Sequence, residues 1–100
     1  MRTPPTESLN KLQQLLIITM EECAELSQVC SKILRIHSRT GRIDKGQLIQ
    51  LEQEVGDVKA MINHMHKHDL LETEGVKTAI NNKIQKLKKW STLIEGINDE

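Results

Sequence analysis

Apolar side chains between residues 9 and 36 recur at steps of three, four and seven, along two separate stripes. Such steps place side chains on one helix face, so the segment predicts one long helix, or two nearly collinear ones, ending at about Ile36. Thr6 or Ser8 is expected to cap its start, after an irregular tail at residues 1–6 that contains two prolines. The first stripe consists of Leu9, Leu12, Leu16, Met20, Cys23, Ser27, Cys30 and Leu34, and the second stripe consists of Leu15, Ile18, Glu22, Leu26, Val29, Ile33 and Ile36. A helix that is apolar on two faces is buried on both, so we expect another subunit to cover one of them.

Two further helices are predicted downstream, separated by short polar segments. Residues 35–42 are basic and contain a glycine break, which predicts a loop. Asp44 is the expected N-cap of a second helix that runs to about His66, and a third helix is expected from about Val76 to Ile94. The apolar stripe of the second helix consists of Leu48, Leu51, Val55, Val58, Ile62 and Met65. The predicted fold class is all-α: a single domain of residues 1–100, built as an antiparallel bundle of three to four main helices and completed by oligomerisation.

The composition narrows the class of protein further. Phe and Tyr are absent and there is one Trp, so aliphatic side chains must form the core, which favours helices over sheets. Lys plus Arg and Asp plus Glu both number 14, and this balance does not match a protein that binds nucleic acid polymers. Cys23 and Cys30 are expected to be reduced, buried thiols, because seven helical residues hold them about 10.5 Å apart, too far for a disulfide. Without a long apolar run or an apolar signal core, we expect no membrane contact and a cytoplasmic location.

Acidic residues interrupt the apolar pattern at two places. Glu22 breaks the second stripe, and Glu25 lies three residues further on, at its edge. A carboxylate buried without a partner is strongly destabilising, so these two residues require a cation nearby. Glu54 and Asp57 form another pair, three residues apart on the second helix. We predict that the two pairs face each other and bind a divalent metal, for which four oxygen ligands favour Mg²⁺, with Mn²⁺ as a substitute.

Three other interpretations of these acids remain open from the sequence. They could be a solvated helix face, although the apolar neighbours of Glu22 oppose this. They could also bind a basic partner in a non-catalytic helical interaction module. The third alternative is a di-iron carboxylate bundle, but such sites use a Glu-x-x-His motif on two helices, and no His lies three residues after any Glu.

The two acidic motifs also resemble those of a known family. The chain contains Glu21-Glu22-Cys23-Ala24-Glu25-Leu26 and, about 30 residues later, Glu54-Val55-Gly56-Asp57-Val58. This pair is similar to the E-E-x-x-E and E-x-x-D motifs of the MazG-like nucleotide pyrophosphohydrolases, which belong to the all-α NTP pyrophosphatase superfamily. The general layout is similar over about residues 9–90, and only the two motifs are specific. The resemblance implies Mg²⁺-dependent hydrolysis of a nucleoside triphosphate to the monophosphate and pyrophosphate, by a homodimer or homotetramer.

The short length resembles compact, phage-encoded members of that family. Some of those members act on dGTP, which implies control of a nucleotide pool in the cytoplasm of a bacterium or of an infected host cell. The absence of Phe and Tyr departs from members that stack the base between aromatic side chains. The resemblance therefore leaves the base and the sugar of the substrate open.

The resemblance also implies roles for individual residues. By the family pattern the metal ligands are Glu22, Glu25, Glu54 and Asp57, and the catalytic candidates are Glu21 and Glu22. Glu21, the first acid of the motif, would lie beside the metal ligands or act as the base for the attacking water. A basic segment after the second motif contacts phosphates in the family, and residues 81–86 are similar in character. The candidates for substrate binding are accordingly Lys83 and Lys86, together with Lys32 on the first helix.

Overall fold

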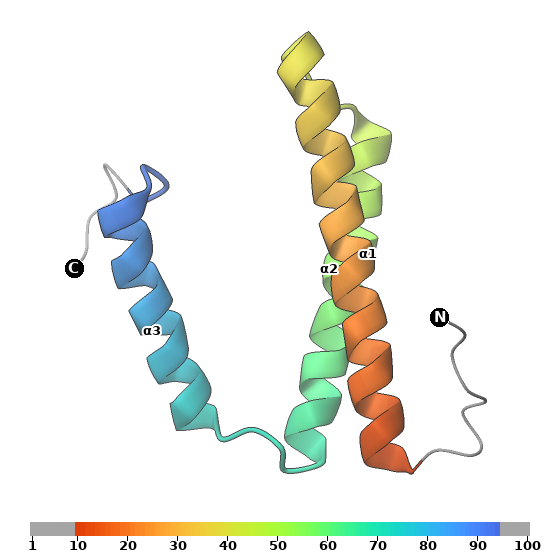
Figure 1. The fold of residues 1–100 in the computed structure, drawn as a ribbon, viewed down its shortest axis with the longest axis vertical. Helices are drawn as coiled ribbons and strands as arrows, with labels where there is room; N and C mark the ends of the chain where they lie inside the picture. Colours follow the sequence, from red (N-terminus) through yellow and green to blue (C-terminus); the bar gives the residue numbers. More distant parts are fainter. Residues whose placement is uncertain (1–9, 95–100) are drawn as a thin grey trace.

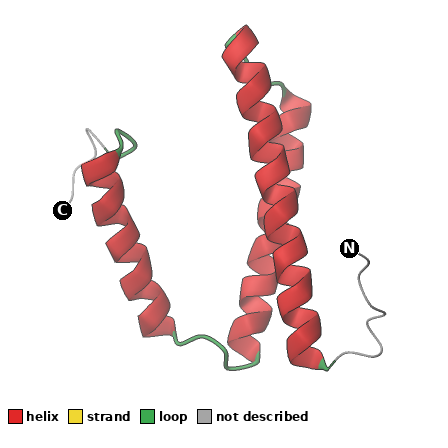
Figure 2. Cartoon of the chain, in the orientation of Figure 1, coloured by secondary structure: helices red, strands yellow, loops and turns green. Residues whose placement is uncertain are grey.

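Three α-helices make up the part of the chain that the structure, a computed structural model, describes: residues 10–94 (Figure 1). They are α1 (Lys11–Thr40), α2 (Lys45–Lys67) and α3 (Thr73–Trp90). Residues 10–94 contain no β-strand, as Figure 2 shows. The predicted all-α class is confirmed over this range, with three helices where three to four main helices were expected. None of these three helices is both long enough and apolar enough to cross a membrane.

A reciprocal capping box starts α1. The side chain of Asn10 accepts a hydrogen bond from the backbone N–H of Gln13 at 2.8 Å, and the Gln13 side chain accepts one from the Asn10 N–H at 3.1 Å. Two of the N–H groups that a helix start leaves without intrahelical partners are thereby satisfied. The expected caps, Thr6 and Ser8, lie outside the described residues.

The C-terminal end of α1 extends further than the sequence predicts. The helix continues through most of residues 35–42 to Thr40, so the predicted end near Ile36 is wrong. The Thr40 hydroxyl donates to the Ile36 carbonyl at 2.9 Å, and Arg39 lies in the last turn, where a positive charge complements the helix dipole. Gly41 then ends the helix with a left-handed φ of 71°, and its N–H donates to the His37 carbonyl at 2.7 Å.

The start of α2 lies where the sequence predicts it. Asp44 is the N-cap, and its side chain accepts a hydrogen bond from the Gln47 N–H at 2.7 Å. The Gln47 side chain accepts one from the Asp44 N–H at 3.3 Å, which completes a second capping box. Because only residues 41–44 separate the two helices, α2 runs back antiparallel along α1 (Figure 1). α2 ends at Lys67, one residue beyond the predicted His66.

The seam between α1 and α2 holds the core of the described chain. Leu15 and Val29, both from the second stripe, are each 6% exposed, and they are the only buried apolar residues within residues 10–94. Leu51 and Val58 of α2 are half-buried, and α2 is the helix that packs on α1. Burying a side chain of this size contributes about 1.5–3 kcal/mol. The seam therefore stabilises the hairpin but is a small core for a whole domain.

The first stripe of α1 faces solvent in the single chain. Its large apolar side chains are 43–70% exposed, and both cysteines are exposed as well: Leu12, Leu16, Met20, Cys23, Cys30 and Leu34. The prediction that Cys23 and Cys30 are buried thiols is therefore wrong for one chain. The physical reason is that none of the described helices covers this face of α1.

α3 stands apart from the α1–α2 hairpin, and it contributes no buried residue (Figure 1). It begins at Thr73, earlier than the predicted Val76, and ends at Trp90, before the predicted Ile94. Ile80 and Trp90 are 54% and 77% exposed. The described chain is thus an antiparallel hairpin with a separate third helix, and closure of the bundle stays a prediction.

The overall dimensions agree with an incomplete core. The radius of gyration is 17.1 Å, whereas a compact domain of 100 residues has about 13 Å. The accessible surface is 8463 Å², whereas a folded monomer of 11.4 kDa exposes about 5,800 Å². One copy therefore exposes about 2,700 Å² more than a compact fold of the same mass.

Candidate metal centre

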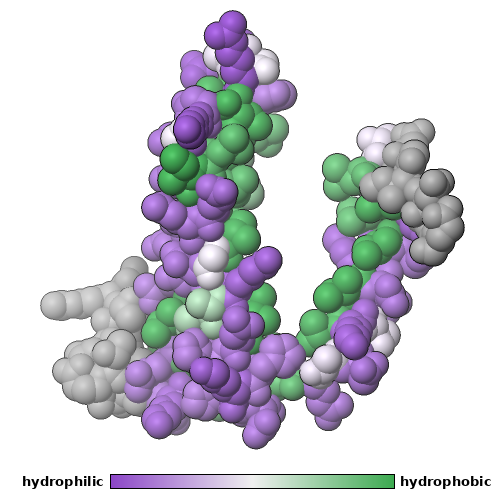
Figure 3. All heavy atoms as spheres, turned by 180° about the vertical axis from the view of Figure 1, so that it is seen from behind, coloured by the Kyte–Doolittle hydropathy of each residue, from purple (hydrophilic) through white to green (hydrophobic). Residues whose placement is uncertain are grey.

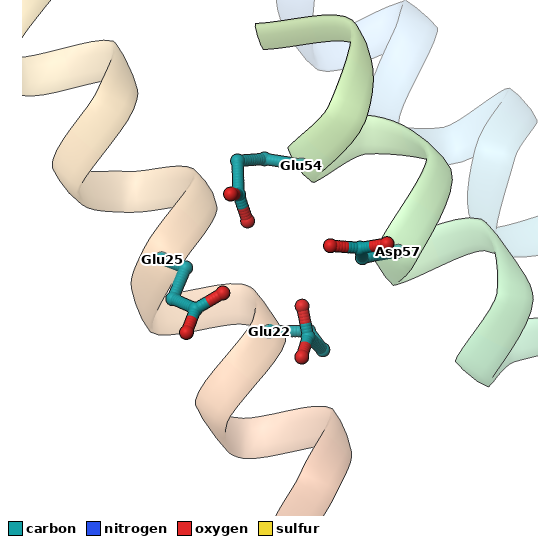
Figure 4. A group of neighbouring side chains, drawn as sticks. All are labelled: Glu22, Glu25, Glu54 and Asp57. Carbon is teal, nitrogen blue, oxygen red and sulfur yellow. The ribbon is translucent and has the colours of Figure 1, made fainter. Parts of the chain in front are cut away.

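Four carboxylates converge at the middle of the α1–α2 seam. Glu22 and Glu25 extend from α1, and Glu54 and Asp57 extend from α2 toward them (Figure 4). Each side chain offers one oxygen, and these four oxygens all lie within 4.8 Å of one another. The spacing of three residues puts each pair on one side of its helix, and the antiparallel hairpin brings the two pairs to the same level. We refer to these four residues as the carboxylate cluster.

Burial divides the cluster into two kinds of side chain. Glu22 and Glu54 are half-buried, whereas Glu25 and Asp57 are exposed. One oxygen each of Glu22 and Glu54, the Oε2 atom, is shielded from solvent and accepts no hydrogen bond from the protein. A shielded carboxylate oxygen without a partner costs free energy, so a ligand that pairs with both oxygens would remove this cost.

The electrostatic environment raises the pKa of both half-buried acids. For Glu22 the main cause is burial, followed by the negative charge of Glu25 and by its contacts with Asp57. For Glu54 the main cause is again burial, followed by the charge and proximity of Glu25. Both causes disfavour the ionised carboxylate, so without a cation the cluster retains protons above the usual pH range of glutamate.

The donor set of the cluster fits a hard divalent cation. It consists of carboxylate oxygens alone, which Mg²⁺ and Mn²⁺ prefer, whereas zinc and other softer ions favour nitrogen and sulfur. The shielded oxygens of Glu22 and Glu54 supply an independent observation, because they lack a partner that a cation would provide. Glu22, Glu25, Glu54 and Asp57 are therefore the residues that could hold a metal, as the sequence predicts.

The other candidates on α1 lie near the cluster but outside it. Glu21 is exposed, one helical turn before Glu25, and does not belong to the converging set. Lys32 is exposed two turns after Glu25, about 10.5 Å further along the helix and on the same side of it. Glu21 and Lys32 therefore lie on α1 on either side of Glu25 along the helix.

The candidates on α3 lie elsewhere in the single chain. Lys83 and Lys86 are exposed side chains of α3, which does not pack on the hairpin. One chain therefore does not bring them to the carboxylate cluster. The sequence interpretation also overlooked Gln47, a polar side chain that is 6% exposed. Its signal was available, because Asp44 followed by Gln47 three residues later is a capping-box pattern.

Comparisons with protein-family models, with curated proteins and with solved structures find no match for this chain. No relative therefore contributes a fold, a ligand or a set of functional residues to the interpretation. The geometry of the carboxylate cluster and the motifs that build it are the observations from which a function can be argued.

Proposed function

We propose that the protein is a Mg²⁺-dependent nucleoside triphosphate pyrophosphohydrolase, which converts a ribo- or deoxyribonucleoside triphosphate and water to the monophosphate and pyrophosphate. The observation that carries the proposal is the convergence of four carboxylate oxygens within 4.8 Å, supplied by two motifs on two helices. The resemblance of those motifs to the MazG-like pattern supports the reaction class. dGTP is a candidate substrate, and control of a nucleotide pool is the corresponding cellular role.

Each acid has its own task in this proposal. Glu22, Glu25, Glu54 and Asp57 hold the divalent cation between α1 and α2. When bound there, such a cation supplies charge neutralisation for the phosphate chain and a more acidic water. Glu21, which borders the cluster on its exposed side, accepts a proton from the attacking water. A positioned base of this kind contributes about 10²–10⁴-fold to a rate.

Basic side chains bind the phosphate chain in this proposal. Lys32 lies within two helical turns of Glu25, and a lysine side chain spans part of that distance. Lys83 and Lys86 reach the same ligand only if α3 docks on a hairpin, whether its own or that of a neighbouring copy. The excess exposed surface of one chain supports an assembly, and we propose a homodimer or homotetramer as the active form.

A substrate screen tests the reaction class. All natural ribo- and deoxyribonucleoside triphosphates are incubated with the protein and Mg²⁺, and pyrophosphate and single phosphate are measured separately. We expect pyrophosphate release from one substrate or a small group of substrates. Release of single phosphates, or no turnover of any triphosphate, would contradict the proposal.

Two isosteric variants test the cluster itself. Glu22→Gln and Asp57→Asn keep the shape of the side chain and remove one charge each, so we expect loss of pyrophosphate release with unchanged helical content by circular dichroism. The matched control is Glu52→Gln, an exposed acid of α2 that lies outside the cluster, which should retain activity. If both cluster variants release pyrophosphate at the wild-type rate, the assignment is wrong.

A further inference from the structure

Basic residues are concentrated at the closed end of the hairpin, where α1 ends and α2 begins. Residues 26–45 contain five lysines and arginines and one aspartate, a formal charge of +4. The whole chain has a formal charge of zero, so the remaining residues carry −4. The one acid of this end, Asp44, is the N-cap of α2 and accepts a hydrogen bond from the Gln47 N–H. Figure 3 shows strongly hydrophilic residues around this upper end of the hairpin. Such a concentration of positive charge attracts anions.

Three of these cations, Lys32, Arg35 and Arg39, form a row on one face of α1. Their steps of three and four residues place them on adjoining turns, about 4.5 Å and 6 Å apart along the helix axis. All three side chains are exposed, and none of them forms an ion pair within residues 10–94. Glu25 is the nearest acid of α1, seven residues before Lys32. We refer to the three cations as the basic row, whose charges have no anionic partner in the described part of the chain.

Two surface hollows adjoin the basic row. The larger, of about 710 Å³, is lined by all three cations together with Ser38 and two aliphatic side chains. The smaller, of about 540 Å³, is lined by Lys32 and Arg35 together with Gln28 and two serines. Small-molecule sites in proteins have volumes of about 300–1,000 Å³, so each hollow has the size for a small ligand. The polar linings consist of guanidinium, ammonium, amide and hydroxyl groups, all of which can donate hydrogen bonds, so the ligand that fits is an anion.

The hollows lie apart from the carboxylate cluster. None of the four acids of the cluster lines either hollow. Arg35 and Arg39 are about 15 Å and 21 Å beyond Glu25 along the axis of α1, whereas neighbouring side chains on a helix are about 5–6 Å apart. The two arginines therefore do not share a phosphate with the four acids, and Lys32 is the cation that lies between the two places.

The chemistry of the basic row favours phosphate groups. An arginine guanidinium presents its donors in a planar fork that pairs with two phosphate oxygens at once. Two arginines and one lysine along about 10.5 Å of helix match several linked phosphates better than one isolated anion. Among the described residues, no aromatic side chain lines either hollow, so a base would find no stacking partner there. A long polyanion running along α1 would meet Glu25 and the rest of the carboxylate cluster, and charge repulsion disfavours it.

We propose that the basic row is a second ligand site, separate from the metal centre, that binds a short phosphate chain, either free or as part of a nucleotide. Arg35 and Arg39 pair with phosphate oxygens, and Lys32 adds a third positive charge. The dipole of α1 opposes an anion only in the last turn, near Arg39, so the ligand is centred on Arg35. The three side chains supply the positive charge themselves, so binding requires no divalent cation and does not depend on the proposed hydrolysis.

Calorimetric titration of the full-length protein with inorganic tripolyphosphate tests the site. EDTA is present, so that no divalent cation joins the phosphates to the carboxylate cluster. We expect Arg35→Gln and Arg39→Gln each to raise the dissociation constant of tripolyphosphate at least about tenfold, because each removes a charged, bidentate contact. Circular dichroism should show unchanged helical content in both variants. The matched control is Lys59→Gln, which removes an exposed positive charge of α2 that lines neither hollow, and it should leave the dissociation constant unchanged.

Further titrations identify the ligand. A nucleoside triphosphate that binds more tightly than tripolyphosphate under the same conditions assigns a nucleotide to the site, and equal or weaker binding assigns the phosphate chain alone. Absence of tripolyphosphate binding by the wild-type protein, or an equal loss in Lys59→Gln, would overturn the proposal. Equally tight binding of a polyglutamate peptide or of phosphatidylserine vesicles would also overturn it, because the basic row would then recognise negative charge rather than a short phosphate chain. Neither result bears on pyrophosphate release, which the substrate screen measures separately.

Discussion

Two leucine-to-alanine substitutions on the same helix should have very different effects on stability. Leu15 is 6% exposed in the α1–α2 seam, whereas Leu34 is 66% exposed on the first stripe. Truncating a buried leucine costs about 2–5 kcal/mol, because a cavity remains. For a domain of this size each kcal/mol lowers the melting temperature by about 4–8 °C, so Leu15→Ala should lower it by at least about 8 °C. This fall in melting temperature should not depend on protein concentration, because Leu15 packs within its own hairpin.

Leu34→Ala distinguishes an isolated chain from a pair. In one chain the side chain is mostly solvated, so the substitution should change the free energy of unfolding by less than about 0.5 kcal/mol. If a neighbouring copy of the proposed homo-oligomer covers Leu34, the substitution should lower the melting temperature, and more so in dilute protein.

Thermal melts of both variants over a hundredfold range of protein concentration measure these effects. A Leu15→Ala protein as stable as the wild type would refute the assignment of the seam as the core. A concentration-independent loss in Leu34→Ala, equal to that of Leu15→Ala, would show that the first stripe is covered within the same chain.

Four further predictions concern the cluster and the helix ends. The pKa values of Glu22 and Glu54 are raised, so the folded chain still holds protons that the unfolded chain releases near pH 4.5. Without divalent metal, the free energy of unfolding should therefore fall as the pH rises from 4.5 through the raised pKa values. In the proposed site Mg²⁺ binds the ionised carboxylates, so the melting-temperature increase on adding Mg²⁺ should be larger at alkaline than at acidic pH. An equal increase at both pH values would contradict the site. Gly41→Ala should cost about 1 kcal/mol in chemical denaturation, since φ is 71° although no atom lies within 4 Å of an added Cβ. Asp44→Ala should cost about 1 kcal/mol by removing the side-chain bond to the Gln47 N–H, and wild-type stability would show that the cap is dispensable.

The elements of the fold were predictable where local signals agree with packing. Asp44 combines a capping side chain with the apolar stripe that follows it, and α2 begins there. The C-terminal end of α1 was harder to predict, because the polar residues after Ile36 have the composition of a loop. They continue the helix since Thr40 bonds back to the preceding turn and Gly41 supplies the left-handed cap. Local chemistry in the last turn therefore outweighed the polarity of the segment.

The four acids of the candidate site were predictable from the sequence, but the burial of their oxygens and the position of the lysines were not. The spacing of Glu22 with Glu25 and of Glu54 with Asp57 identifies four acids that the structure brings together. The sequence does not specify which of their oxygens are shielded, because that depends on how the two helices are aligned along the hairpin. It also could not place Lys83 relative to the acids, since the position of α3 depends on contacts between elements, or between copies, that no local pattern encodes.

The carboxylate cluster divides the hairpin seam into two apolar halves, one around Leu15 and the other around Val29. Repulsion among the four carboxylates is concentrated at the middle of the α1–α2 seam. Removing a bound cation would therefore weaken helix packing there more than at either end of the hairpin. Chelation should then speed amide hydrogen exchange most in the turns of α1 and α2 next to the acids, while the short connection at Gly41 stays protected. If the cluster binds the proposed cation, the stiffness of this hairpin depends on the free concentration of divalent ions in the surrounding solution.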